Sequence, residues 1–102
     1  MINDIKKKIA DGLYEYSRHA VDQSIKRRIA VHEIVEAIGS ESLIIEDYPY
    51  DKYGSSCLIY GVTKTGRPLH VHCSYPDRKP VKIITVYEPD KNLWIDNRVR
   101  RK

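Results

Sequence analysis

The chain has 102 residues, of which 41% are hydrophobic and 31% are charged, and its net charge is +4 at pH 7. This length predicts a single domain over residues 1–102, and the hydrophobic share excludes a disordered chain. No apolar run approaches the roughly 20 residues that cross a membrane, and the charged start over residues 1–8 lacks a signal-peptide pattern. We therefore expect a cytoplasmic protein that does not enter membranes. The modest positive excess favours an anionic partner such as RNA.

The first part of the chain predicts three helices from the helical spacing of its apolar residues. The first ends near Gly12, and the third carries Val31, Ile34, Val35 and Ile38 and is ended by Gly39. Between the first and the second, Tyr14–Tyr16 is predicted to be a short connector. Ser17 is a good N-cap for the second helix. One face of that helix carries Val21, Ile25 and Arg28.

Four strands, rich in β-branched residues and tyrosine, are predicted in the second part of the chain. They are Leu43–Tyr48, Cys57–Thr63, Pro68–Ser74 and Val81–Glu88. Because no long helical crossover separates them, we expect an antiparallel sheet. The predicted fold class is α+β, with two to three N-terminal helices packed on one face of a four-stranded antiparallel sheet. The end of the chain, residues 98–102, is predicted to be a short basic tail.

Strand alternation sorts the predicted sheet into two faces. A three-residue loop over residues 64–66 places Tyr60 opposite His70, and the next hairpin places Thr85 opposite His70. The face expected to pack on the helices carries Cys57, Ile59, Leu69, Val71, Cys73, Ile84 and Val86. The other face carries Tyr60, His70, His72, Ser74, Thr85 and Tyr87, with Leu58, Val62 and Ile83 between them. This second face is predicted to be open and to bind a ligand.

His70 and His72 lie two residues apart in a predicted strand, so their side chains point the same way. Two imidazoles on one face can share a metal ion or a substrate, but a zinc site needs further ligands, and the chain has no Cys-x-x-Cys motif. Proton transfer on a phosphodiester needs no metal and suits histidine, whose pKa lies near neutrality. We therefore predict no metal and no cofactor. A metal site at the two histidines stays a third option, which elemental analysis would decide.

Three further side chains could contact a phosphate. His19 follows Ser17 at a helix start, where backbone N–H groups attract anions, although its polar neighbours also fit an ordinary surface histidine. Arg67 precedes the third strand, where its guanidinium could bind a phosphate with two hydrogen bonds or lie in water. Arg28 ends the second helix and could also reach the sheet.

Several short motifs occur in a fixed order along the chain. They are Tyr16-Ser17-x-His19-Ala20, Glu46-Asp47-Tyr48-Pro49 with Gly54 and Ser56-Cys57-Leu58, Gly66-Arg67-Pro68-Leu69-His70-Val71, and Ile83-Ile84-Thr85-Val86-Tyr87-Glu88-Pro89-Asp90 with Trp94. Together, over roughly residues 14–101, they resemble a prokaryotic family of small domains of unknown function. That family looks related to RelE/ParE-like toxins and to the barnase–colicin–RelE ribonuclease fold.

The resemblance implies a RelE-like fold with a site on the sheet face away from the helices. It implies cleavage of RNA without metal, including ribosome-associated mRNA, and a small cognate antitoxin as partner, sometimes with a zinc finger. The polar positions of the family pattern fall on His19, Arg67, His70 and Tyr87. His72 departs from the pattern, because the family is more often apolar there.

Two functions follow from these observations. In the first, a toxin-like endoribonuclease, the substrate's 2′-hydroxyl attacks the adjacent phosphate. His19 and His70 serve as acid and base in either order, and Arg67 stabilises the charge on the phosphate. Tyr87 orients the phosphate, and further RNA contacts are expected from Tyr60, His72, Thr85 and Arg28. The second function is a non-catalytic module that binds RNA or a protein through the tyrosine-rich face and the basic tail.

Overall fold

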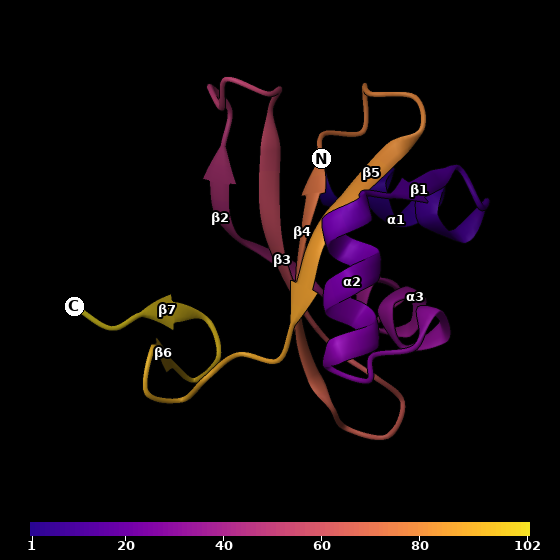
Figure 1. Ribbon diagram of the computed structural model, residues 1–102. Coiled ribbons are helices and arrows are strands. Elements are labelled where there is room, and N and C mark those ends of the chain that lie inside the picture. Colours follow the sequence, from indigo (N-terminus) through magenta and orange to yellow (C-terminus); the bar gives the residue numbers. More distant parts are fainter.

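A five-stranded sheet forms the centre of the computed structural model, which describes residues 1–102 (Figure 1). Its strands are β1 (Tyr14–Tyr16), β2 (Leu43–Tyr48), β3 (Ser56–Val62), β4 (Pro68–Ser74) and β5 (Val81–Tyr87). Across the sheet the order is β1-β5-β4-β3-β2, with β1 parallel to β5 and the other neighbours antiparallel. The predicted α+β class is confirmed, with one strand more than the four predicted.

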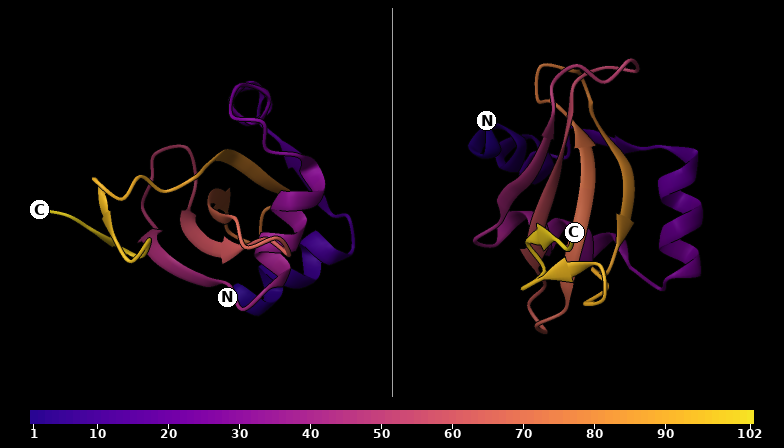
Figure 2. Two further views of the ribbon diagram at one scale, coloured as in Figure 1. Left: turned by 90° about the horizontal axis from the view of Figure 1, so that it is seen from below. Right: turned by 90° about the vertical axis from the view of Figure 1, so that its left-hand side faces the viewer.

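The helices are α1 (Ile2–Ala10), α2 (Arg18–Lys26) and α3 (Val31–Gly39), as the apolar spacing predicts. Ser17 caps α2, because its side chain accepts a hydrogen bond of 2.9 Å from the backbone N–H of Ala20. Helices α1 and α3 pack together and α3 lies on β3 and β4, whereas α2 packs on β5 and β1 (Figure 2). None of these helices is long and apolar enough to cross a membrane.

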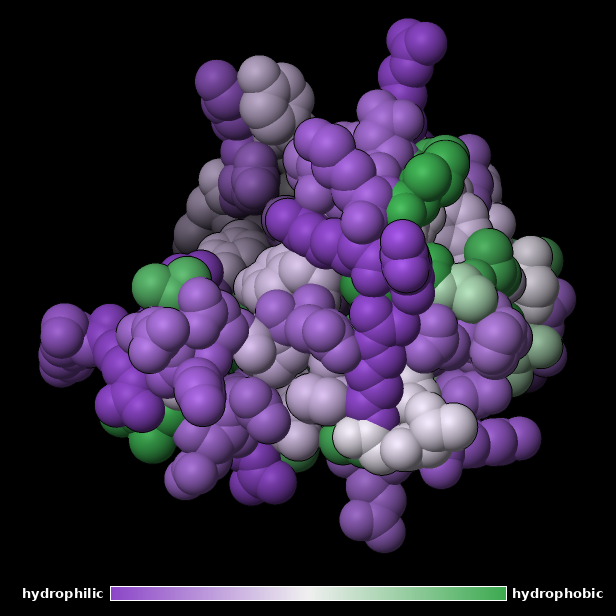
Figure 3. All heavy atoms as spheres, turned by 60° about the horizontal axis from the view of Figure 1, so that its bottom comes forward, coloured by the Kyte–Doolittle hydropathy of each residue, from purple (hydrophilic) through white to green (hydrophobic).

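The apolar face of α2 points outward. Val21 and Ile25 lie on one side of the helix, as predicted, but they are 42% and 71% exposed. Arg28, predicted on the same face, lies beyond the helix, because α2 ends at Lys26 and Arg28 has a positive φ. The residue of α2 that is buried against the sheet is Ala20. Hydrophobic atoms accordingly gather at the surface on the right-hand side of Figure 3, where α2 and α3 lie.

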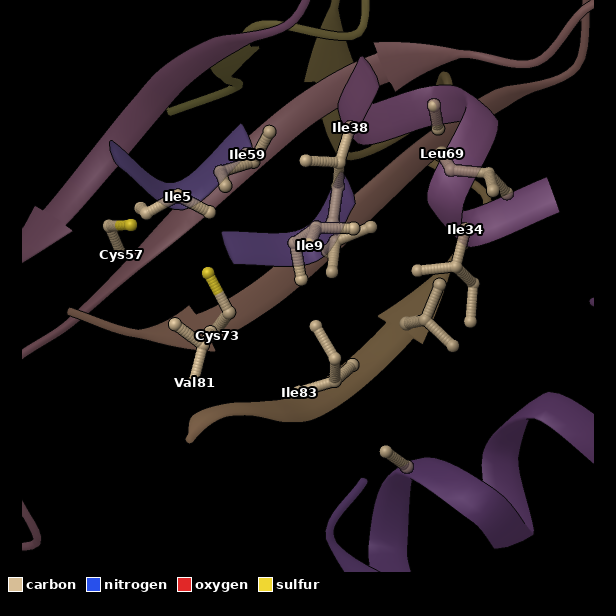
Figure 4. Close-up of a cluster of buried hydrophobic side chains, with 14 of the residues drawn as sticks. Ile5, Ile9, Ile34, Ile38, Cys57, Ile59, Leu69, Cys73, Val81 and Ile83 are labelled. Carbon is tan, nitrogen blue, oxygen red and sulfur yellow. The ribbon is translucent and has the colours of Figure 1, made fainter. Parts of the chain in front are cut away.

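The core lies between the sheet and helices α1 and α3 (Figure 4). Ile5 of α1 and Ile34 of α3 are buried in it, together with Ile59 of β3 and with Leu69, Val71 and Cys73 of β4. Helix α3 crosses β3 so closely that a Cβ atom at Gly61 would lie 2.0 Å from the carbonyl oxygen of Ala37. Glycine at this position therefore permits the contact between α3 and β3.

The segment Tyr14–Tyr16 is a strand, so its prediction as a connector was wrong. It pairs in parallel with β5, with Tyr14 opposite Val81 and Tyr16 opposite Ile83. Three residues are too short to show strand alternation. The hydrogen-bonding partners of this strand also lie more than sixty positions away in the chain.

The register of β3 with β4 is as predicted, with Tyr60 opposite His70, but the register of β4 with β5 is not. His70 lies opposite Tyr87 rather than Thr85, and a bulge shifts the register between His72 and Cys73. The bulge adds one residue to β5 and so exchanges the sheet faces predicted for two isoleucines. Ile83, predicted on the open face, is fully buried in the core, and Ile84, predicted on the packed face, is partly exposed. The loop over residues 75–80 is long enough to leave this register unspecified, unlike the tight loop at 64–66.

A small hairpin follows the sheet, formed by β6 (Trp94–Ile95) and β7 (Val99–Arg100). Three residues, Asp96–Arg98, connect the two strands, and Asp96 and Asn97 have a positive φ, which Asp and Asn tolerate better than most residues. The predicted basic tail therefore begins inside a folded element. The hairpin lies on the opposite side of the sheet from α1 and α3, at the left of Figure 1. Trp94, 3% exposed, buries its ring against His70.

Candidate functional site

The sheet face away from α1 and α3 holds a hollow of about 370 Å³, which we term the open hollow. Strands β2 to β5 and the hairpin supply its lining: Tyr48, Leu58, His72, Thr85, Tyr87 and Arg100, with Asp51 from the loop after β2. A larger hollow lies beside α1. Its lining consists mainly of aspartates and lysines, with Leu13 and Pro76 as the apolar side chains. Only the open hollow combines an imidazole, two phenols and a guanidinium. Side chains of these types can bind a phosphate ester and transfer protons to and from it.

His72 is the accessible imidazole of this face. Its Nε2 lies 2.8 Å from the hydroxyl oxygen of Ser56, and its ring meets that of Tyr48 edge-on at 5.5 Å between centroids. Its Nδ1 has no partner in the chain and is not sealed from solvent. Burial lowers the pKa of His72, and the negative charge of Asp51 opposes this only in part. The ring is therefore neutral at pH 7 and has a lone pair available to a ligand.

His70 is fully buried, although the same face carries it. The rings of Trp94 and Tyr87 meet it edge-on at 4.5 Å and 5.2 Å. Its Nε2 lies 2.6 Å from the carbonyl oxygen of Asn97, and because a carbonyl only accepts, Nε2 carries the proton. Nδ1 then accepts from the Tyr87 hydroxyl at 3.2 Å. Burial lowers the pKa of His70, so both nitrogens of a neutral ring are engaged beneath the hairpin.

Arg67 is fully engaged as well. Its Nε donates to Glu88 at 2.7 Å, and Nη1 donates to Glu33 at 3.1 Å. Nη1 and Nη2 also donate to the backbone carbonyls of Arg28 and Arg27, at 2.8 Å and 3.0 Å. The hydrogen bonds that Arg67 donates to Glu88, and then to Glu33, raise the pKa of Arg67. The guanidinium thus fastens the end of α2 to α3 and to the residue after β5, and each of its nitrogens already donates inside the chain.

The predicted site residues therefore fall in different places. Thr85, Tyr87 and His72 share the open hollow, and Tyr60 lies beside His70, with 6.0 Å between ring centroids. His19 is exposed on α2, which packs on β5 and β1, and its side chain forms no hydrogen bond. The structure does not bring His19 to His70, and the exposed side chain of Arg28 lies at the end of α2, away from the hollow.

Three contributors to the hollow were missed by sequence reasoning. Arg100 of β7 donates to Glu46 at 2.7 Å and lies 4.6 Å from the centroid of the Trp94 ring. Tyr48 also donates to Glu46. Burial opposes ionisation of Glu46, but the hydrogen bonds from Arg100 and Tyr48 outweigh it and lower the pKa of the carboxyl. Ser56 is the third, through its bond to His72. Two features of the sequence could have indicated these residues. Tyr48 belongs to the Tyr48-Pro49 pair of the family-like motifs, and Arg100 belongs to the basic end of the chain.

The two histidines of β4 do not share a ligand position. His70 turns its nitrogens to Asn97 and Tyr87, whereas His72 turns Nε2 to Ser56. No group of three or more His, Cys, Asp or Glu side chains is placed to hold a metal ion.

Comparison with known protein families assigns the chain to a family. A family model described as a domain of unknown function, DUF4258, matches residues 16–88. The chain belongs to this family. No curated protein and no solved structure matches it. The part matched to DUF4258 runs from the end of β1 to the residue after β5, so it contains both histidines of β4 and leaves the hairpin with Arg100 outside.

Proposed function

We propose that this DUF4258 protein is a toxin-like endoribonuclease that cleaves RNA without metal at the open hollow. The observation that supports this most is the neutral imidazole of His72, whose Nδ1 has no partner in the chain and which lines the same hollow as Arg100. A base and a cation around one phosphate are the minimum for attack by a 2′-hydroxyl. The kinship with RelE/ParE-like toxins is part of this proposal.

His72 acts as the base. Its Nδ1 accepts the proton of the 2′-hydroxyl, and the 2′-oxygen attacks the adjacent phosphorus. The bond from phosphorus to the 5′-oxygen breaks, and the imidazolium returns the proton to that oxygen, which leaves a 2′,3′-cyclic phosphate and a 5′-hydroxyl. For Nδ1 to be the base, Nε2 must keep its proton and donate it to the Ser56 hydroxyl. Asp51, which favours the charged ring, stabilises the imidazolium between the two transfers.

Arg100 takes the role that the sequence suggested for Arg67. Its side chain is 60% exposed, and its pairing with Glu46 lies at the rim of the hollow. Because this guanidinium is largely exposed, its ion pair contributes only about 1 kcal/mol. Tyr48 also donates to Glu46, so a phosphate can take over the guanidinium without leaving the carboxylate unpaired. Arg67 cannot do this without releasing the end of α2.

The hollow also has the size and walls for one nucleotide. Its volume of about 370 Å³ lies at the lower end of the roughly 300–1,000 Å³ of small-ligand sites. Tyr48 and Tyr87 supply aromatic surface on which an unpaired base can stack. His70 fixes the hydroxyl of Tyr87 from below, so it is a positioning residue rather than the acid or base.

The test is cleavage of a single-stranded RNA by purified protein in the presence of a chelator. Replacement His72→Ala should lower the cleavage rate by about 10²–10⁴, the usual contribution of a general base. His32→Ala on the exposed surface of α3 is the matched control and should leave the rate unchanged. Full activity in His72→Ala would refute the assignment. Products without a 2′,3′-cyclic phosphate would refute the mechanism.

A second function is favoured by a specific observation. Both nitrogens of His70 and all three of Arg67 are engaged inside the chain, so His72 is the one imidazole left for chemistry on this face of the sheet. A non-catalytic module that binds RNA needs only the aromatic rings and the arginines of this face. It would bind the same RNA without cleaving it, and His72→Ala would change the affinity little. A small antitoxin is the partner that the toxin function requires and the binding module does not.

A further inference from the structure

Helix α2 has an outward face that nothing in the chain covers. Ile25 is 71% exposed and Val21, one turn earlier, is 42% exposed. Beside them lies a shallow hollow of about 350 Å³, lined by Ser24, Ile25 and Arg28 and by Ile29 and Ala30 of the following connection. The two side chains and this hollow form one surface, which we call the α2 outer face. It lies on the side of Figure 3 where hydrophobic atoms gather. A surface helix normally buries its apolar side chains, so this arrangement calls for a partner.

Two arginines frame the apolar stripe. Arg18, the first residue of α2, precedes Val21 by three positions and lies on the same side of the helix. Arg28 lies beyond the last residue of the helix, with a φ of 54°, and lines the hollow beside Ile25 and Ile29. Neither guanidinium forms a salt bridge or a hydrogen bond within the chain. At about 1.5 Å per residue, the nine residues of α2 span about 14 Å, so one cation stands at the start of the helix and the other just past its end. Between residues 18 and 28 the one acidic residue is Asp22.

The positions of the two arginines indicate which kind of partner can bind the α2 outer face. Two copies of the chain paired through α2 would set arginine against arginine whether the helices ran parallel or antiparallel, because a cation stands at each end of the stripe. An RNA backbone would satisfy the cations but would leave Val21 and Ile25 in contact with water or phosphate. A partner with apolar side chains at its centre and carboxylates at both ends satisfies every group.

We propose that the α2 outer face docks an acidic amphipathic helix of another protein. Apolar side chains of the partner, spaced three or four residues apart, pack on Val21 and Ile25 and enter the hollow beside Ile29. Carboxylates about ten residues apart on that helix pair with Arg18 and Arg28. The surface lies on a different element from the open hollow, so the proposal stands whether or not the protein cleaves RNA.

The experiment uses the full chain and a synthetic peptide of about 18 residues as the probe. The peptide is helical, with leucines on one stripe and a glutamate pair about ten residues apart, and it carries a fluorophore for anisotropy. A peptide of the same composition in permuted order is the control. We expect the stripe peptide to bind and the permuted peptide to bind at least about tenfold more weakly.

Variants of the chain locate the contact. Ile25→Ser should weaken binding about tenfold, whereas Leu93→Ser, at a residue that is 59% exposed on the far side of the protein, should leave it unchanged. The double variant Arg18→Glu, Arg28→Glu should lose the glutamate peptide and gain a peptide in which lysine replaces glutamate. This exchange tests the charge pairing directly, and all substituted side chains are exposed, so folding is preserved.

Three results would overturn the proposal. Equal binding of the stripe and permuted peptides, or binding unaffected by Ile25→Ser, would show that the face has no specific helix site. Binding of a single-stranded RNA oligonucleotide that is lost in the arginine variant but not in Ile25→Ser would make the face a nucleic-acid surface. Self-association in sedimentation that is abolished by Ile25→Ser would make it an interface between copies.

Discussion

Replacement of His70 by alanine separates a structural role from a catalytic one. The imidazole is fully buried, and its removal leaves the Asn97 carbonyl without its donor and the Tyr87 hydroxyl without its acceptor. An orphaned buried group costs about 1–3 kcal/mol, and each lost edge-on aromatic contact costs about 0.5–1.5 kcal/mol. For two orphaned groups and two aromatic contacts, the lower ends of these ranges predict that His70→Ala lowers the free energy of unfolding by at least about 3 kcal/mol.

His72→Ala is the matched comparison, because the two histidines lie on the same strand and the same face. His72 is only partly buried and forms one hydrogen bond, so its loss should cost about 1 kcal/mol. Urea unfolding followed by circular dichroism gives both values by linear extrapolation. Amide hydrogen exchange should also show that His70→Ala, and not His72→Ala, deprotects the hairpin from Trp94 to Arg100.

The result that would refute this reasoning is specific. If His70→Ala unfolds at the same urea concentration as the wild type but loses RNA cleavage, the histidine is catalytic and the hairpin does not cover it in solution. If both variants are stable and only His72→Ala loses cleavage, the burial argument fails while the proposed base is retained.

Three further predictions concern stability and charge. Gly61→Ala should destabilise the fold by more than about 3 kcal/mol, as overpacking against backbone does, whereas Gly39→Ala, where a Cβ meets nothing within 4 Å, should lie within about 0.5 kcal/mol of the wild type in thermal unfolding. Arg67→Met should lower the melting temperature, because the Arg67 guanidinium connects α2 to Glu33 and Glu88. Below that temperature the rate of RNA cleavage should stay within about twofold of the wild-type rate. A loss of cleavage of about a hundredfold or more would show that Arg67 is a phosphate ligand. Burial places the pKa values of His70 and His72 below their unfolded value, so the unfolded chain binds more protons and stability falls as pH drops through about 6.5, by up to about 1.4 kcal/mol per pH unit for each histidine. Urea titrations from pH 7.5 to 5 check this, and a stability that rises on acidification would contradict it.

Local rules predicted the parts of the fold that short-range chemistry controls. The Ser17 cap, the three helices and the β3–β4 pairing depend on residues within a few positions of one another, or on a three-residue loop that leaves one register. The β4–β5 register depends on a bulge at the end of a longer loop, which no local pattern marks. β1 was missed because a three-residue strand shows no alternation until β5 supplies its partner.

The sequence predicted which face of the sheet carries the candidate site, but not which side chains form it. Alternation placed His70 and His72 on the side of the sheet away from α1 and α3, which the structure agrees with. It could not show that Arg67 is committed to backbone carbonyls forty positions away, because those contacts form only when α2 packs. Arg100 was taken as part of a tail, since strands of two residues have no readable pattern.

The sequence by itself determined the α+β class, most of the elements and the polar character of one sheet face, because helix spacing, strand alternation and capping act over a few residues. Only the tertiary structure decided which histidine a substrate can reach. Trp94 and Asn97, more than twenty positions after His70, fold back over it and leave His72 open beside Arg100. Accessibility is a property of what packs on a side chain, and packing between distant segments is set by the whole chain.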